Sequence, residues 1–303
     1  MKADDIKTVL MIGAGNMGQQ IGFLCAMKNF DVVMYDVGAD ELKKAGDRVA
    51  KLARQFVDSS QISREAADTA LSRIRYVADA AEAARNADIV SESVPEDPQL
   101  KGRVLGQFNT LCPARTVFTT NTSSLIPSMF AAATGRPDRF AAFHFHDVRV
   151  TNIVDIMPHP GTAPETIAVI RGFAERLGQI PIMMKKENFG YVFNAMLMEL
   201  TKSAQTLAAN GVATVEDIDR AWMGVMNTLV GPFGIMDSIG LDTVWKVTDY
   251  WAKILKEPQA LANAAFIKQY VDRGEVGVKS GKGFYSYPNP AFGRPGFIQG
   301  KED

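Results

Sequence analysis

The chain has 303 residues, of which 47% are hydrophobic and 22% charged, and its formal net charge is −1. This length predicts about two domains, and the composition is typical of a globular protein. A charge near zero gives no support to a nucleic-acid partner or a membrane surface, and two cysteines are too few for a disulfide framework.

The compartment follows from what the sequence lacks. No apolar stretch is long enough to span a bilayer, and the first residues do not have the basic and apolar regions of a signal peptide. Cys25 and Cys112 both lie in apolar contexts, which indicates buried thiols in a reducing environment. We therefore expect a cytoplasmic protein.

The first elements have the order that a dinucleotide-binding βαβ unit requires. An apolar run at 9–12 predicts a strand, and it is followed by a glycine turn, a helix over 19–28 and a second strand over 32–35. The turn consists of Gly13, Ala14, Gly15, Asn16, Met17 and Gly18. Its glycines allow a tight bend and a close approach of the backbone to a pyrophosphate, which then meets the N-terminus of the helix.

An acidic residue follows the second strand at the spacing expected for ribose recognition. Asp36 lies 23 residues after Gly13, where a carboxylate accepts hydrogen bonds from a ribose 2′-hydroxyl and repels a 2′-phosphate. No arginine follows it closely. The sequence therefore predicts NAD rather than NADP.

Alternating helices and strands continue as far as residue 184. Helices are expected over 39–57, 63–71, 78–85, 98–111 and 162–177, and strands over 75–77, 87–94, 116–120, 140–146, 152–157 and 180–184. We expect the first two of these helices to form an antiparallel pair, with Ser63 as an N-cap, and 162–165 to form a capping box. The pattern predicts an α/β fold with a doubly wound, Rossmann-type sheet.

Polar residues follow two of these strands. Glu96 comes after the strand over 87–94, and the segment Asn121–Ser124 comes after the strand over 116–120. Since ligands of open α/β sheets bind outside the carboxyl ends of the strands, both are candidates for the site.

From about Lys185 the sequence pattern predicts helices alone. They are expected over 189–209, 215–229, 241–255 and 259–271, with Thr214 and Asp242 as N-cap candidates and Gly211 as a C-cap candidate. We therefore predict an NAD-binding Rossmann domain over 1–186 and an all-helical C-terminal domain over 187–303.

The three histidines of the chain lie close together in the sequence, at His144, His146 and His159. If the two strands there form a hairpin centred between 149 and 150, His144 lies directly opposite Asp155. The carboxylate would then fix the imidazole tautomer and leave the other ring nitrogen free as a base. The intervening residues have no hairpin-turn signature, so this register is an assumption.

Three interpretations of these histidines compete. His144 could be a hydrogen-bonded histidine at a strand end, or His144 and His146 could bind a metal together with a carboxylate. The third interpretation is an acid–base pair that serves hydride transfer. Because a lone His-x-His is common and NAD chemistry needs no metal, we expect no metal here and favour the acid–base pair.

Several motifs occur in an order and spacing that resemble one family along essentially the whole chain. They are the glycine turn, Asn121–Ser124, Arg139-Phe140 followed by His144, Gly190–Asn194, Gly231–Phe233 with Asp237, Gly240–Asp242 and the tail Gly281–Tyr285. This set resembles the NAD-dependent L-3-hydroxyacyl-CoA dehydrogenases, and in particular those of the 3-hydroxybutyryl-CoA dehydrogenase type.

The resemblance implies a role for each matching residue of the catalytic site. His144 matches the base that takes the proton of the substrate 3-hydroxyl as hydride passes to the nicotinamide. Asp155 stands where the family has a glutamate that orients this histidine. Ser123 matches a serine that hydrogen-bonds substrate and cofactor, and Asn194 matches an asparagine that helps hold the substrate carbonyl and the histidine.

The resemblance also implies the cofactor contacts, the assembly and the substrate. Glu96 and Lys101 match residues that contact the ribose and phosphate side of NAD. The family fold joins the doubly wound domain to a helical domain that binds substrate and forms a homodimer. The implied substrate is an acyl-CoA, which would place the reaction in fatty acid metabolism.

The sequence departs from the family pattern near the predicted base. The family usually has Phe-Phe-Asn-Pro after the histidine, whereas residues 145–148 are Phe-His-Asp-Val. The loop to Asp155 is one residue shorter, and Ala195 stands where the family usually has arginine. The helical pair over 39–71 lacks the lysine cluster that meets CoA phosphates and offers only Lys51, Arg54 and Arg64.

These departures leave the substrate open. Residues 154–163 look more like the L-gulonate dehydrogenase and λ-crystallin branch, and other parts look similar to diketoreductases. The alternatives to an acyl-CoA are therefore a free 3-hydroxy acid, a sugar acid or a diketo ester. A catalytically idle NAD-binding protein is the remaining hypothesis.

Overall fold

The computed structural model describes residues 1–301, which divide into two units. The first unit is Met1–Asn194, and the second begins at Ala195. Each unit has hydrophobic core clusters of its own.

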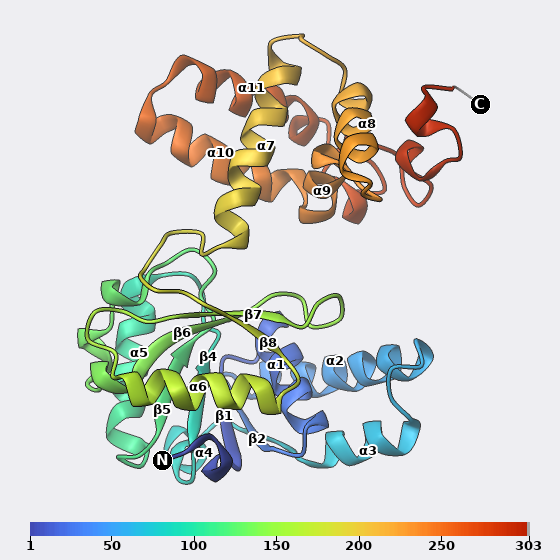
Figure 1. Ribbon diagram of the computed structural model, residues 1–303. Coiled ribbons are helices and arrows are strands. Elements are labelled where there is room, and N and C mark those ends of the chain that lie inside the picture. Colours follow the sequence, from blue (N-terminus) through green and yellow to red (C-terminus); the bar gives the residue numbers. More distant parts are fainter. Residues whose placement is uncertain (302–303) are drawn as a thin grey trace. The chain divides into compact units, whose positions relative to one another are not determined.

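An eight-stranded sheet organises the first unit (Figure 1). Its strands are β1 (Thr8–Ile12), β2 (Asp31–Tyr35), β3 (Ile74–Val77), β4 (Ile89–Glu92), β5 (Val117–Thr120), β6 (Phe140–Phe145), β7 (Ile153–Met157) and β8 (Ile180–Met183). Their spatial order is β3-β2-β1-β4-β5-β6-β7-β8. Neighbouring strands are parallel except β6 and β7, which are antiparallel. The predicted doubly wound sheet is confirmed, and its strand order changes direction between β1 and β4, where such sheets bind ligands.

Helices cover both faces of this sheet. One face carries α1 (Asn16–Met27), α2 (Ala39–Asp58), α3 (Arg64–Ser72) and α6 (Pro164–Arg176), and the other carries α4 (Ala80–Ala84) and α5 (Pro98–Leu111). Side chains of β1 alternate between the two cores, since Val9 and Met11 belong to the first and Leu10 and Ile12 to the second. Burial on both faces explains why the parallel strands are continuous apolar runs.

The helix caps of the first unit agree only in part with the prediction. Ser63 is the N-cap of α3, and its hydroxyl accepts a hydrogen bond from the Ala66 amide at 3.1 Å. The capping box at 162–165 is wrong, because α6 begins at Pro164 with Ala163 as its N-cap. The Thr162 hydroxyl instead donates to the Phe140 carbonyl at 2.8 Å, which ties the loop before α6 to the sheet.

Helices form the second unit within the described residues (Figure 1). They are α7 (Phe193–Ala209), α8 (Val215–Met226), α9 (Pro232–Ile239), α10 (Leu241–Leu255) and α11 (Pro258–Asp272). Thr214 caps α8 as predicted, and Gly211 follows α7 with a φ of 65°. Asp242 is not an N-cap; it lies in the first turn of α10 and pairs with Lys279 at 2.5 Å. No helix among residues 1–301 is both long and apolar enough to cross a membrane.

A buried carboxylate, Asp219, joins α8, α9 and the C-terminal tail. It accepts hydrogen bonds from the amides of Phe233 and Gly234, at 2.8 and 3.0 Å, in the first turn of α9. It also accepts one from the Tyr285 hydroxyl at 2.9 Å. The Asp219 carboxylate thereby satisfies two of the free amides that every helix N-terminus carries.

Asp237 of α9 holds the same tail from a second side. Its carboxylate accepts hydrogen bonds from the Phe284 and Tyr285 amides, each at 2.9 Å, and from the Tyr287 hydroxyl at 3.0 Å. The glycine-rich, aromatic tail is therefore an ordered part of the second unit.

The stability of this unit should depend on the charge of Asp219. Burial raises the pKa of Asp219 from 3.8 to about 6, although the Phe233 and Gly234 amides and the Tyr285 hydroxyl act in the opposite direction. Because the folded state binds this proton more tightly than the unfolded chain, the contribution of Asp219 to stability is present at low pH and is lost as the pH rises through about 6.

We expect the melting temperature to fall between about pH 4 and about pH 6, the interval between the unfolded and folded pKa values of Asp219, and to fall less in Asp219→Asn. Calorimetric melting across this range would measure both slopes. Asp242→Asn is the control, because Lys279 already holds the pKa of Asp242 below its usual value. Identical slopes for Asp219→Asn and the native chain would contradict the assignment.

Candidate active site

The predicted site residues lie at one edge of the sheet. Because β1, β2, β4, β5 and β6 run in the same direction, the segments that follow them share this edge. These segments carry the glycine turn, Asp36, Glu96 and Ser123, and His144 lies near the end of β6.

The glycine turn combines tight internal packing with one open position. A Cβ on Gly13, whose φ is 101°, would lie 2.7 Å from the Ser93 carbonyl oxygen, and one on Gly18 would lie 2.0 Å from the Gly13 oxygen. A Cβ on Gly15 would meet nothing within 4 Å. Gly13 and Gly18 are therefore required by the chain itself, whereas Gly15 leaves space in which a ligand can approach the backbone before α1.

Asp36 lies at the end of β2 and supports this turn. One of its oxygens, Oδ2, accepts a hydrogen bond from the Ala14 amide at 2.9 Å. The carboxylate thus lies beside the turn, where the sequence places a ribose partner. The open position at Gly15, the N-terminus of α1 and this carboxylate together fit a dinucleotide.

His144 and Asp155 form a buried pair across β6 and β7. The predicted register is confirmed, since the two residues are directly opposite each other. His144 Nδ1 lies 3.1 Å from Asp155 Oδ2, and the two residues are 4% and 1% exposed. Burial alone would raise the pKa of Asp155, but hydrogen bonds from His144 and His146 hold it below its usual value. An ionised Asp155 therefore accepts a hydrogen bond from the Nδ1–H group of His144 and leaves Nε2 free as a base.

His146 contacts the same carboxylate oxygen. Its Nε2 atom lies 3.3 Å from Asp155 Oδ2, and the ring centroids of the two histidines are 4.6 Å apart. The two-residue spacing of His144 and His146 in an extended segment places them on one face of the sheet. It did not indicate that both reach Asp155, because this depends on side-chain rotamers as well as on strand register.

Tyr191 and Asn121 support the pair; of the two, only Asn121 lies in a segment that the sequence marks as a candidate for the site. The Tyr191 ring packs on the His144 ring, with the two ring centroids 5.0 Å apart, and Tyr191 is 1% exposed. The Asn121 side-chain oxygen accepts a hydrogen bond from the Phe145 amide at 2.8 Å, which fixes the end of β6 against β5. The motifs Asn121–Ser124 and Gly190–Asn194 were the only sequence signals for these residues.

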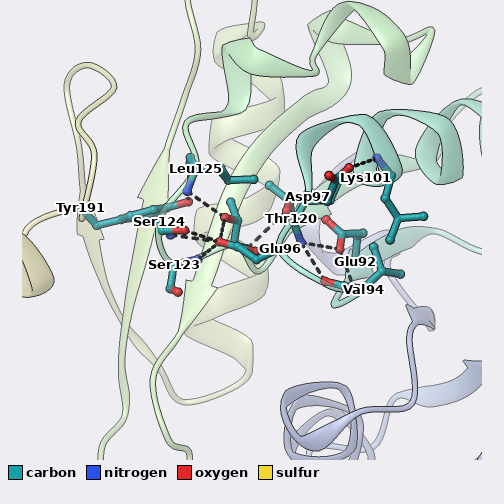
Figure 2. Close-up of polar contacts among 12 residues, drawn as sticks. Glu92, Val94, Glu96, Asp97, Lys101, Thr120, Ser123, Ser124, Leu125 and Tyr191 are labelled. Atoms are coloured by element: carbon teal, nitrogen blue, oxygen red, sulfur yellow. Dashed lines mark hydrogen bonds and ion pairs between the residues drawn. The ribbon is translucent and has the colours of Figure 1, made fainter. Parts of the chain in front are cut away.

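Glu96 organises the segment that carries Ser123 (Figure 2). Its Oε1 atom accepts hydrogen bonds from the Ser123 and Ser124 amides, each at 3.2 Å, and from the Ser124 and Thr122 hydroxyls. Burial would raise the pKa of Glu96, but Lys101 and these hydroxyls keep it below its usual value. Glu96 is therefore an ionised clamp on this loop.

The resemblance predicts that Lys101 contacts the cofactor, but its side chain is buried and does not reach the edge of the sheet where the glycine turn lies. It is 1% exposed, and its ammonium lies 2.8 Å from Glu92 Oε1, 3.0 Å from the Val94 carbonyl and 3.3 Å from Glu96 Oε2. These three partners account for its three hydrogens. The structure therefore assigns Lys101 a role in positioning Glu96, beside which its ammonium lies (Figure 2).

Glu92 is a buried charge that the sequence analysis missed. It is 0% exposed and also accepts hydrogen bonds from the Thr120 hydroxyl at 2.6 Å and the Val94 amide at 2.7 Å. Burial raises the pKa of Glu92, while Lys101 and these donors act in the opposite direction. We read Glu92 as an ionised partner of Lys101, because every neighbour of its oxygens is a donor.

Ser123 and Asn194 are placed without a direct bond to the histidine pair. The Ser123 side chain is exposed on the loop that Glu96 holds, and Asn194 is half-buried in the first turn of α7. Among the hydrogen bonds of the described residues, none joins Ser123 or Asn194 to His144. Their predicted roles toward substrate stay predictions.

The chemistry of this edge is proton transfer beside a dinucleotide. It offers one oriented imidazole with a free nitrogen, an ionised carboxylate behind it and a turn that can accommodate a pyrophosphate. A hydroxyl compound bound here could lose its proton to the imidazole and a hydride to the cofactor.

Comparison with protein families gives two matches that together cover most of the chain. Residues 8–188 match the NAD binding domain of 3-hydroxyacyl-CoA dehydrogenase, and residues 190–287 match the C-terminal domain of the same family.

Individual relatives agree with these matches. The chain is 31% identical over 288 residues to the mitochondrial hydroxyacyl-coenzyme A dehydrogenase of Homo sapiens, covering 93% of this chain and 91% of that protein. Among solved structures, a diketoreductase that catalyses reactions of dicarbonyl compounds is 37% identical, with a TM-score of 0.87 over 93% of this chain and 99% of its own. An (S)-3-hydroxybutyryl-CoA dehydrogenase of Ralstonia eutropha is 30% identical, with a TM-score of 0.83 over 94% of this chain and 100% of its own.

Proposed function

The chain belongs to the 3-hydroxyacyl-CoA dehydrogenase family and is an NAD-dependent oxidoreductase of CH–OH groups, and we propose that it interconverts a short-chain L-3-hydroxyacyl-CoA and its 3-oxoacyl-CoA. The observation that carries this proposal is the buried His144–Asp155 pair at the edge where the glycine turn lies. The 3-hydroxybutyryl-CoA and 3-hydroxyacyl-CoA names of the relatives support the choice of substrate.

The proposed mechanism assigns the proton to His144. In the oxidation direction, His144 Nε2 takes the proton of the 3-hydroxyl, and the C3 hydrogen leaves as hydride. Bound NAD⁺ supplies the acceptor for that hydride. Asp155, whose Oδ2 lies 3.1 Å from Nδ1, accepts a hydrogen bond from the Nδ1–H group and stabilises the imidazolium that forms. In the reverse direction His144 returns the proton to the 3-oxo oxygen.

Five further residues complete the proposed site. Glu96 and Lys101 hold the loop that presents Ser123, whose hydroxyl would hydrogen-bond the substrate oxygen beside the nicotinamide. Asn194 would hold the substrate carbonyl. The side chain of Asp36 would accept a hydrogen bond from the ribose through its oxygen that does not bind Ala14.

The charges between α2 and α3 bear on CoA recognition. A cavity of about 190 Å³ lies there, and its lining includes Arg54 and Arg64 together with Asp58 and Asp68. The two guanidinium groups could meet a CoA phosphate, but the two carboxylates offset their charge. This balance, and the 37% identity to a diketoreductase, favour a second candidate function with the same chemistry on a dicarbonyl compound that lacks CoA.

Steady-state NADH oxidation with acetoacetyl-CoA and with acetoacetate separates the two candidates. If CoA is recognised, kcat/KM is higher for acetoacetyl-CoA, and Arg54→Ala or Arg64→Ala raises KM for it by about tenfold, as expected for a lost charge-assisted hydrogen bond. Neither variant should change KM for acetoacetate.

Arg48→Ala is the matched control, because Arg48 is an exposed arginine of α2 outside the cavity. Comparable kcat/KM values for the two compounds would reject the CoA thioester and favour the second candidate. Absence of NADH oxidation with every 3-oxo substrate would favour a catalytically idle protein instead.

The same proposal includes a homodimer formed by the second unit. Helix α10 exposes Val247, Tyr250, Trp251 and Ile254, which share one helical face because they are three and four residues apart. Such an exposed apolar stripe is typical of an interface, and light scattering after gel filtration would measure the molecular mass in solution.

A cytoplasmic location is proposed as well, supported by the free, buried thiols of Cys25 and Cys112.

A further inference from the structure

Two imidazoles converge on one carboxylate oxygen at the active site. Asp155 Oδ2 lies 3.1 Å from His144 Nδ1 and 3.3 Å from His146 Nε2. The ligand atoms that these three residues offer all lie within 4.8 Å of one another. The orientation of His144 requires only one of these contacts, so the second is unexplained by acid–base catalysis.

The separations suit a tetrahedral zinc ion. Zn²⁺ binds imidazole nitrogen and carboxylate oxygen at about 2.0–2.2 Å, so neighbouring ligands of one ion lie about 3.4 Å apart. Both nitrogen-to-oxygen distances are already close to this value. Only the two ring nitrogens need to approach each other, which small rotations of the side chains can achieve.

The backbone holds the three residues in this arrangement. His144 and Asp155 are paired across β6 and β7, and His146 follows two residues later on the same face. On the opposite face, Phe143 and Phe145 are buried in the core of the first unit. The His146 side chain is 17% exposed, so an ion can enter, and a water can complete the coordination.

We propose that His144, His146 and Asp155 form a Zn²⁺ site that inhibits the enzyme. A zinc ion on Nδ1 of His144 requires the ring proton to move to Nε2, the atom that must be free to accept the substrate proton. The bound ion would also replace the hydrogen bond between Asp155 and His144. Zinc thus removes the base without being a cofactor, and this inference goes beyond the proposed function.

Isothermal titration with ZnCl₂, without substrate, tests the site directly. The native chain should bind one ion, and His146→Phe should weaken binding by at least about tenfold, because removal of even an outer-shell partner of a metal costs 10–100-fold. Cys112→Ser is the matched control, since it removes a different zinc-binding side chain and should leave the affinity unchanged. Mg²⁺, which prefers oxygen ligands, should not bind.

Activity gives the second readout. Zn²⁺ should inhibit NADH oxidation reversibly on addition of EDTA, with an inhibition constant at least about tenfold higher in His146→Phe. Equal zinc affinity in the native chain and His146→Phe, or no binding to either, would overturn the proposal. Because the titration needs no substrate, its result tests the zinc site even if the proposed reaction is wrong.

If His146→Phe does not fold, the site can be tested instead by adding Co²⁺ to the native chain and recording its visible absorption spectrum. Visible bands of a tetrahedral site with nitrogen and oxygen ligands would support the proposal. Sulfur-to-metal charge-transfer bands, or no bands, would reject it.

Discussion

Replacing His144 with alanine should lower kcat by about 10²–10⁴-fold, the usual contribution of a general acid–base group. The Nδ1 atom of His144 is held by Asp155, and its Nε2 atom is free at the edge of the sheet where the glycine turn lies. Asp155 is placed to stabilise the protonated form of this imidazole. The glycine turn and Asp36 come from β1 and β2, so the affinity for NADH should be nearly unchanged. Steady-state kinetics and NADH fluorescence titration measure the two quantities.

Two further variants make this result specific. Asp155→Asn should also reduce kcat strongly, because an amide can donate to Nδ1 and so favour the wrong tautomer. His159→Gln is the control for losing an imidazole elsewhere, since His159 bonds to the Pro137 carbonyl and the Gly161 amide rather than to the pair. It should change the melting temperature and leave kcat near the native value. Near-full activity of His144→Ala would show that another group is the base.

The sequence predicted the sheet well because its signals are local. Parallel strands buried on both faces are short apolar runs, and the glycine turn marks the first crossover. The opposition of His144 and Asp155 followed from the two-residue period of strands once a hairpin centre was assumed. The structure confirms that register although Asp147–Thr151 lacks the sequence signature of a hairpin turn. The Asp147 carbonyl accepts hydrogen bonds from the Val150 and Thr151 amides, and these bonds close a turn between the two strands.

Features that depend on tertiary contacts were missed. Helix α9 has eight residues, and its N-terminus is stabilised by Asp219 from another helix, which no local periodicity reveals. Thr162 bonds to the distant Phe140 carbonyl instead of capping α6. Glu92 is the last residue of β4, and its pairing with Lys101 appears only when α5 packs on the sheet.

The sequence indicates which residues belong to the site better than it indicates which groups their side chains contact. Motif order indicated His144, Asp155 and Glu96, since each follows or lies in a strand at the expected spacing. No sequence pattern indicates that the Lys101 side chain is buried or that His146 contacts Asp155 as well as His144 does. Both depend on the direction of a long or planar side chain, which spacing does not determine.

The pair of Glu92 and Lys101 leads to the second large expected effect, which is on stability. Both side chains are at most 1% exposed, and Nζ lies 2.8 Å from Oε1. Removing one partner of a buried ion pair leaves an uncompensated charge and typically costs about 3–5 kcal/mol. For a unit of this size, that cost corresponds to a melting temperature lower by about 6–20 °C.

Lys101→Met should therefore lower the melting transition of the first unit by this amount, as measured by calorimetry, which can resolve the two units. It should also raise KM for NAD, because Glu96 loses its cation and the Ser123 loop loses its support. The double variant Lys101→Met with Glu92→Gln should recover part of the stability, since no buried charge is then left unpaired. Lys44→Ala, which breaks the exposed pair with Glu41, is the control and should cost less than about 1 kcal/mol. A loss as small as that in Lys101→Met would mean that Glu92 is neutral in the folded protein and that Lys101 does not position the loop.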